Sequence, residues 1–439
     1  MTRSSAEADR ADAPAPAERL SGRLLALARA ASRLAERDGD APMLDAEPVG
    51  PHEPVREQLR AATVAAEAAA LSAEASASDL EPLRRAFLAG HLRAVAAVAS
   101  ALAGAETPAE RVVADLTGLP AARCEGATLV ARDAALADAL PGRGDVVERA
   151  EAWRRAARLP VGRPALWNEL VLVTLAELRR RAAATVELPP PDVVEVALVR
   201  GPRPLARTRR LGDGRARLEV GIEAPATVVD LVRELARETW PGRATARWAV
   251  DRRLRVEAGW PEAGVLFSAS PLAALVEGAA SLALDAVMPP AEAARFAGAE
   301  VAARAGIGTG GADLEAMFRA ASLVDALDAR GDCATTLLEG SSEPTAGLRL
   351  ASVACTAPSD AAAVVLSMRP VAQRLAACAA AAGRAALAPL VRRDGAAALA
   401  ALLRVGLEPS AVATLCAASE RSPRATVPRG SGGAASRAR

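Results

Sequence analysis

The sequence predicts a mainly α-helical protein that contains one small β-sheet. Ala- and Leu-rich segments, such as residues 20–31 and 80–92, carry apolar residues at three- and four-residue spacing. This spacing is typical of helices with one buried face. In residues 192–223, by contrast, apolar and polar residues alternate with period two. With 51% hydrophobic residues in a chain of 439, there is enough apolar surface for a large core.

The elements follow in a definite order. Residues 18–188 are predicted to be helical, after a disordered tail over residues 1–17 that is rich in Ala, Pro, Ser and charge. A triple proline introduces the β region 189–225, where VVEVALV and RLEVGIE predict a pair of strands around a Gly-, Pro- and Arg-rich connection. A second helical region spans residues 226–418, and residues 419–439 form a second disordered tail.

Local start and stop signals divide the second helical region. Apolar spacing after Pro225 predicts a helix that continues to Pro241-Gly242, and a further helix begins at Arg243. Ser270-Pro271 supplies an N-cap and a proline at the first helical position, and Pro289-Pro290 ends that helix. Three tryptophans in this region, Trp240, Trp248 and Trp260, are expected to be core or cleft-wall side chains.

Charge and rare residues exclude several kinds of protein. The 54 basic and 53 acidic side chains nearly cancel, which argues against a wholly electrostatic binder of nucleic acid or membrane surfaces. Only His52 and His91 could provide imidazole chemistry. Five cysteines without a C-x-x-C pair predict free thiols in a reducing cytoplasm. We find no export signal, and the longest apolar run, residues 94–103, is about half a membrane span, so we expect a cytoplasmic protein.

The most informative segment lies between residues 231 and 283. Residues 237–244 (RETWPGRA), followed by Ser270-Pro271 and Glu277-Gly278, resemble the H-E-x-x-P-G-H-H motif, and the later helix carrying E-G, of a zinc metallopeptidase family known as domain of unknown function 885. Residues 44–51, 140–144 and 209–225 are similar to its D-a-y-y-G-P element, its L-P-G-x-G turn and the strand before its metal helix. The likeness covers most of residues 20–410 and implies a mainly helical metallopeptidase-like body with a small sheet beside the active helix.

The motif lacks the residues that hold zinc. The resemblance implies histidine ligands at positions 237 and 243, a general base at Glu238 and a third ligand at Glu277. Here Arg237 and Arg243 replace both histidines, and Ala244 replaces the third histidine of the pattern. A guanidinium keeps its proton and cannot coordinate a metal. A normal zinc site therefore cannot be assembled, and we expect no metal and no other cofactor.

Charge counting predicts what replaces the metal. Zinc with two imidazoles and two carboxylates sums to zero charge, as do two arginines with two glutamates. We therefore expect Arg237 or Arg243 to occupy the vacated metal position and to pair with Glu277. The alternative is that Glu238 and Glu277 are ordinary exposed helix charges.

A second candidate binding element is rich in arginine. Residues 200–217 contain seven arginines and one acid, and Arg209 and Arg210 could hold phosphate or carboxylate groups on a hairpin. The alternative is a solvated loop. No aromatic residue lies among these arginines, so stacking on nucleic-acid bases is not supported.

These observations predict a catalytically inactive protein that binds or scaffolds, with a peptide or an acidic small ligand as its partner. The alternative is an active metal-dependent hydrolase that uses carboxylates and a harder metal such as magnesium or manganese. The carboxylates available for such a site are Glu238, Asp251, Glu257, Glu262 and Glu277.

Overall fold

A computed structural model describes residues 15–37, 39, 42–45, 60–124, 126–188, 193–201, 204–212, 214–309 and 311–421. These residues are mainly helical and include one small sheet, which confirms the predicted fold class. The first helix begins at Pro16 and the last ends at Arg421, so regular structure extends slightly into both predicted tails. The remaining parts of the tails, and His52, lie outside the described residues.

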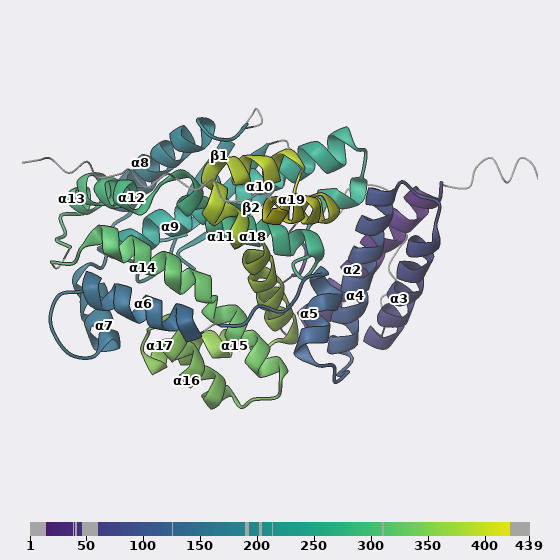
Figure 1. The fold of residues 1–439 in the computed structure, drawn as a ribbon, viewed down its shortest axis with the longest axis horizontal. Coiled ribbons are helices and arrows are strands. Elements are labelled where there is room, and N and C mark those ends of the chain that lie inside the picture. The colour runs from purple at the N-terminus through teal and green to yellow at the C-terminus, as the bar shows by residue number, and fades with distance from the viewer. Residues whose placement is uncertain are drawn as a thin grey trace, which may run out of the picture.

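Seven helices precede the sheet in the described part of the chain. Helices α2 to α5 gather at one end of the molecule (right in Figure 1) around their own apolar cluster. Leu20, Leu24 and Leu27 are buried on α2, as their spacing predicts, whereas Leu80 precedes its helix instead of belonging to it. The bounds are α2 (Pro16–Arg37), α3 (Ala61–Ala77), α4 (Pro82–Leu102), α5 (Ala109–Thr117), α6 (Gly126–Ala139), α7 (Val146–Ala156) and α8 (Pro164–Ala183).

The sheet has three strands in the order β1-β3-β2, namely β1 (Val193–Val199), β3 (Arg215–Gly221) and β2 (Ala206–Gly212). The two predicted strands, β1 and β3, are confirmed and pair in parallel. The predicted connection itself holds β2, which pairs antiparallel with β3. Sequence reasoning missed β2 because it carries arginines on both faces: Arg209 faces solvent, and Arg210 turns inward to an acidic partner from another element.

The helices after the sheet surround a central pair. Helix α11 packs along α18 near the middle of the molecule (Figure 1). Gly395 has a non-helical backbone and kinks α18. The bounds are α9 (Val228–Glu238), α10 (Arg243–Val250), η1 (Asp251–Glu257), η2 (Pro261–Gly264), α11 (Pro271–Val287), α12 (Pro290–Phe296), η3 (Ala297–Ala302), α13 (Ala303–Ala305), α14 (Leu314–Leu327), α15 (Ala329–Leu338), α16 (Glu343–Ala354), α17 (Pro358–Ser367), α18 (Val371–Arg404) and α19 (Pro409–Arg421).

Two helices correct the expectation that no segment is long enough to cross a membrane. In the part of the chain that the structure describes, α4 and α18 are each long and apolar enough to cross a membrane, by length and composition alone. Two bent helix pairs would raise the number to four if each pair were one span. The longest unbroken apolar run does not reveal these two helices, because single polar residues interrupt the run. The mean hydropathy of an Ala-rich helix stays high in spite of such interruptions. In α4 and α18, 56% and 61% of the most apolar window is buried inside the protein, against neighbouring helices.

Candidate functional site

Two helices meet at the segment that resembles the metallopeptidase motif. Helix α9 starts with a capping box between Thr227 and Asp230 and ends at Glu238, and α10 starts at Arg243. The turn between them depends on Gly242. A Cβ atom there would lie 2.1 Å from the carbonyl oxygen of Arg237, so any other residue would collide with the end of α9. This close return brings Arg237 and Arg243 to the same site.

A third helix supplies the carboxylate that faces them. Ser270 caps α11 by accepting a hydrogen bond from the backbone N–H of Ala273, as predicted, and Pro271 occupies the first turn. Two turns later Glu277 reaches the arginines. Its neighbour Gly278 lies against the backbone of α18, where a Cβ atom would be 2.5 Å from the carbonyl carbon of Gly383. Glu277 therefore provides a carboxylate to the site, and Gly278 next to it allows α18 to pack closely against α11.

The arginines and glutamates form one ionic cluster. Arg243 donates from Nη2 to Glu277 Oε2 at 2.6 Å, and its Nη1 lies 3.3 Å from the carboxylate of Glu238. Arg237 Nη2 lies 3.2 Å from the same oxygen of Glu277, and its Nη1 lies 3.2 Å from Glu234. The predicted pairing of Arg237 or Arg243 with Glu277 is confirmed for both arginines. We call Arg237, Glu238, Arg243 and Glu277 the Arg–Glu cluster.

Glu238 is the most buried member, with an exposed fraction of 2%. Its carboxylate accepts a hydrogen bond of 2.7 Å from the backbone N–H of Thr208, on the edge strand β2, in addition to that from Arg243. Its backbone carbonyl accepts a second bond of 2.7 Å from the hydroxyl of Thr208. Glu238 thus joins α9 to the sheet, and cationic and backbone donors occupy the carboxylate that the resemblance would make a general base.

Burial and charge set the ionisation of the cluster. Burial by itself would raise the pKa of Glu277, but Arg243 and Arg237 outweigh it and hold that pKa below its usual value. Burial by itself would lower the pKa of Arg243, but Glu238 and Glu277 raise it. The pKa of Glu234 is raised, chiefly by burial. Glu277 and the two arginines are therefore mutually stabilised ions at neutral pH.

Arg209 and Arg210, the two arginines singled out on the hairpin, both lie on β2 and pair with acids outside the Arg–Glu cluster. The side chain of Arg209 is 67% exposed and approaches Glu219 at 4.0 Å, on the face of the sheet opposite Thr208. Arg210 contacts Asp251 at 2.6 Å and the carbonyl oxygen of Gly264 at 3.1 Å. Within the described residues, neither side chain contacts the Arg–Glu cluster, although the same strand reaches it through Thr208. That Arg209 and Arg210 hold phosphate or carboxylate groups stays a prediction.

The other carboxylates considered for a non-standard metal site, Asp251, Glu257 and Glu262, pair with arginines outside the Arg–Glu cluster. Glu257 pairs with Arg252 and Arg253, and Asp251 pairs with Arg210. Glu262 accepts hydrogen bonds from Ser21 at 2.8 Å and from Arg84 at 3.2 Å. Among the described residues, no group of three or more His, Cys, Asp or Glu side chains is placed to hold a metal ion.

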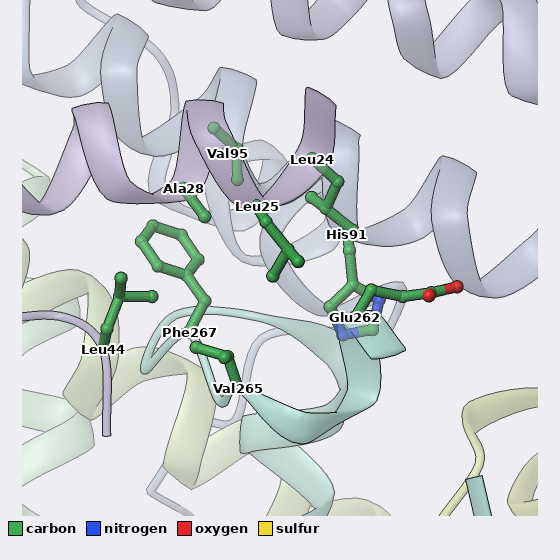
Figure 2. Close-up of a pocket in the computed structure, with 9 residues that line it drawn as sticks. All are labelled: Leu24, Leu25, Ala28, Leu44, His91, Val95, Glu262, Val265 and Phe267. Carbon is green, nitrogen blue, oxygen red and sulfur yellow. The ribbon is translucent and has the colours of Figure 1, made fainter. Parts of the chain in front are cut away.

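A small pocket lies away from the cluster, between α2, α4 and the loop after η2 (Figure 2). His91 and Glu262 are the two polar side chains of its otherwise apolar lining. Nδ1 of His91 lies 2.8 Å from the carbonyl oxygen of Phe87, and burial lowers the pKa of this histidine to about 4. The space would hold about one water molecule, which is too little for a ligand.

Other matched positions have structural roles. Asp45 forms an ion pair of 2.9 Å with Arg247 and accepts a hydrogen bond from the backbone N–H of Leu266, while residues 46–51 of that element lie outside the described residues. Residues 140–144 form the turn between α6 and α7, with positive φ at both glycines. The three tryptophans are buried, as predicted, at 4–7% exposure. Cys333, Cys355 and Cys378 are buried thiols without a disulfide, as predicted.

Sequence reasoning missed the acidic partners on α11 and α14. Arg233, one turn before Arg237 on α9, contacts Asp285 at 3.1 Å and also pairs with Asp325. The four-residue spacing of Arg233 and Arg237 places both on one face of α9. This spacing is the one feature of the sequence that could have indicated a second arginine beside the site. The partners of Arg233 come from helices about 50 and 90 residues further along the chain, so the sequence near α9 does not reveal them.

Comparisons with known proteins show no family for this chain. No protein-family model matches it, and no curated protein matches it. Among solved structures, one described as "the crystal structure of the putative lipoprotein from Colwellia psychrerythraea" is similar with a TM-score of 0.47 and 14% identity, over 82% of this chain and 68% of that chain. A likeness of this size supports no inference about activity or location. The metallopeptidase resemblance therefore rests on the motif residues.

Proposed function

We propose that this protein is a metallopeptidase-like binding protein without peptidase activity, in which the Arg–Glu cluster stands where the related enzymes hold zinc. The observation that carries the proposal is the position of Arg243, which contacts Glu277 at 2.6 Å and Glu238 at 3.3 Å. These glutamates are the two carboxylates that the motif resemblance assigns to zinc chemistry. A guanidinium that bridges them supplies the positive charge that a metal would otherwise supply.

The residues present do not fit zinc. A catalytic zinc site uses about three protein donors and keeps one position for water. Arginine offers donors of hydrogen bonds only, and each glutamate of the cluster already has an arginine partner. Two guanidiniums and two carboxylates sum to zero charge, so the site is neutral without a metal. We derive no hydrolytic step for this site.

The cluster can still serve binding. The side chain of Arg237 is 37% exposed and that of Arg243 is 24% exposed, so both guanidiniums remain within reach of a ligand. Arginine recognises carboxylates in a bidentate manner. We therefore propose a peptide or an acidic small molecule as the ligand class. Because Cys333, Cys355 and Cys378 are buried thiols without a disulfide, we propose the cytoplasm as the location.

The test restores the missing donors. We would measure zinc by mass spectrometry in the full-length protein and in the double variant Arg237→His/Arg243→His, after exposure to zinc and desalting. We expect less than about one tenth of an equivalent in the wild type and close to one equivalent in the double variant. Adding Glu277→Gln to that variant should remove the gain. The matched control, Arg209→His/Arg215→His, places two histidines on the sheet and should gain none.

Two results would overturn the proposal. Stoichiometric zinc in the wild-type protein, or chelator-sensitive cleavage of a peptide library with magnesium or manganese, would favour the active hydrolase. A folded double variant that gains no zinc would instead show that positions 237, 243 and 277 do not have metallopeptidase geometry, and the resemblance itself would fail.

A further inference from the structure

One face of the sheet is a cationic surface that the Arg–Glu cluster does not use. Along β2 and β3, the more exposed side chains alternate with buried or half-buried ones, so each strand presents every second residue to solvent. The strand register places Arg209 directly opposite Arg217, and Arg217 directly opposite Glu195. We call this surface the outer face, and its charged side chains are Glu195, Arg207, Arg209, Arg215, Arg217 and Glu219.

The outer face has fewer carboxylates than arginines. Glu195 already has two arginine partners, both on β3. Glu219 approaches Nη1 of Arg209 at 4.0 Å, which is too long for a hydrogen bond. Arg207 is exposed and lies opposite Glu219, yet it forms no ion pair and no hydrogen bond within the part of the chain that the structure describes. Negative charge is therefore lacking around Arg207 and Arg209.

Two further features of this surface would be relieved by a partner. Like charges directly opposite one another on neighbouring strands destabilise a sheet, and Arg209 and Arg217 are such a pair, with side chains 67% and 50% exposed. At the end of the sheet beside Arg215, the apolar residues Val193 and Leu211 are each 43% exposed. An anionic partner that also carries apolar side chains would satisfy both features.

We propose that the outer face binds an acidic peptide segment in an extended conformation, with carboxylates on alternate residues that pair with Arg207 and Arg209. Residues two apart in an extended chain lie about 6.5 Å apart on the same side, in the peptide as in β2. Two carboxylates at this spacing match the two guanidiniums, and arginine binds carboxylates in a bidentate manner. A nucleic acid fits less well, because these strands carry no aromatic side chain to stack on bases and the exposed apolar residues would stay uncovered.

The outer face is separate from the site of the proposed function. Thr208 turns from β2 to Glu238 of the Arg–Glu cluster. Its neighbours Arg207 and Arg209 lie on the opposite face of the strand, because successive side chains of a strand point to opposite sides. This inference therefore goes beyond binding at the cluster, and either proposal can fail without the other.

The probe is the fluorescein-labelled peptide Leu-Ser-Glu-Ser-Glu-Ser-Leu, titrated with the full-length protein and followed by fluorescence anisotropy in about 50 mM NaCl, where charges are weakly screened. We expect saturable binding with a dissociation constant below about 1 mM. Replacing both glutamates of the peptide by glutamine should weaken binding about tenfold. The isomer Leu-Ser-Ser-Glu-Glu-Ser-Leu should bind about threefold more weakly, because adjacent carboxylates point to opposite sides of an extended chain.

Variants of the protein locate the binding surface. Arg207→Gln/Arg209→Gln should weaken binding of the peptide about tenfold. The matched control Arg319→Gln/Arg369→Gln removes two exposed arginines elsewhere on the surface and should leave binding unchanged. Arg207→Glu/Arg209→Glu should instead prefer a peptide with lysines in place of the glutamates, a reversal that a loss of structure would not produce. All four positions are exposed, so circular dichroism should show wild-type folding in each variant.

Several results would overturn the inference. They are no saturable binding of the peptide up to about 1 mM, equal binding of the glutamine peptide, or unchanged binding by Arg207→Gln/Arg209→Gln. Tighter binding of a single-stranded DNA of about 20 nucleotides, lost in the same double variant, would assign the outer face to nucleic acid instead. Zinc content of the same preparation tests the proposed function, so a metal-free protein that binds no acidic peptide would reject only this inference.

Discussion

Gly278 of α11 faces Gly383 of α18 so closely that a Cβ atom on either residue would overlap the other helix. A Cβ on Gly278 would lie 2.5 Å from the carbonyl carbon of Gly383, and one on Gly383 would lie 1.8 Å from the carbonyl oxygen of Ala274. Backbone atoms cannot move aside as flexible side chains can. This contact fixes the distance between α18 and the helix that carries Glu277.

Gly278→Ala and Gly383→Ala should therefore each destabilise the protein by about 3 kcal/mol or prevent folding, as overpacking against backbone does. The measurement is urea unfolding followed by circular dichroism. Gly22→Ala is the matched control, because a Cβ on this residue of α2 meets nothing within 4 Å. That control should be neutral or stabilising by up to about 1 kcal/mol. Equal effects at all three glycines would contradict the role of the helix contact.

Glu277→Gln should cost about 2 to 3 kcal/mol, because it leaves two partly buried arginines short of one counter-charge. The matched control is Glu315→Gln, whose exposed pair with Arg319 should contribute less than about 0.5 kcal/mol. Combining Glu277→Gln with Arg243→Met should cost less than the sum of the two single changes. Additive free energies of unfolding in this double-mutant cycle would show that Arg243 and Glu277 do not interact.

The stability supplied by Glu277 should depend on pH. Its pKa in the folded protein is lowered, so its contribution is fully present above the unfolded pKa of about 4.3 and is lost as pH falls through the folded value. The difference in unfolding free energy between wild type and Glu277→Gln should therefore be constant from pH 7 to about 5 and shrink below about pH 4. A difference that is the same at pH 7 and pH 3 would contradict the ionised pairing.

His91 should remain neutral far below the usual range of histidine. Burial lowers its pKa to about 4, whereas an unfolded chain titrates its histidines near pH 6.5. The unfolded state then binds a proton first, so stability should fall as pH drops from about 6.5 to 4, by roughly 3 kcal/mol. With only two histidines in the chain, nuclear magnetic resonance of the His52→Gln variant isolates the His91 signal. A midpoint near 6.5 would contradict its burial.

Local sequence signals predicted the elements that carry the cluster. The apolar spacing of α9, the turn at Pro241-Gly242 and the cap at Ser270 each depend on residues close together in the chain, and each lies where predicted. The pairing of Arg237 and Arg243 with Glu277 was also predictable, because it follows from charge once the motif residues are aligned. The partners of Arg209 and Arg210, Glu219 and Asp251, could not be predicted, because the sequence does not reveal that β2 exists.

By itself, the sequence determined that the chain is mainly helical, where the helices that carry the Arg–Glu cluster start and stop, and that cationic side chains stand at positions 237 and 243. Only the tertiary structure decided that Asp251 pairs with Arg210, that Thr208 bonds to Glu238, and that the backbone of α18 lies against Gly278. The physical reason is the distance along the chain over which each interaction acts. Caps, turns and helical spacing act over a few residues, whereas ion pairing depends on which faces of distant helices pack together.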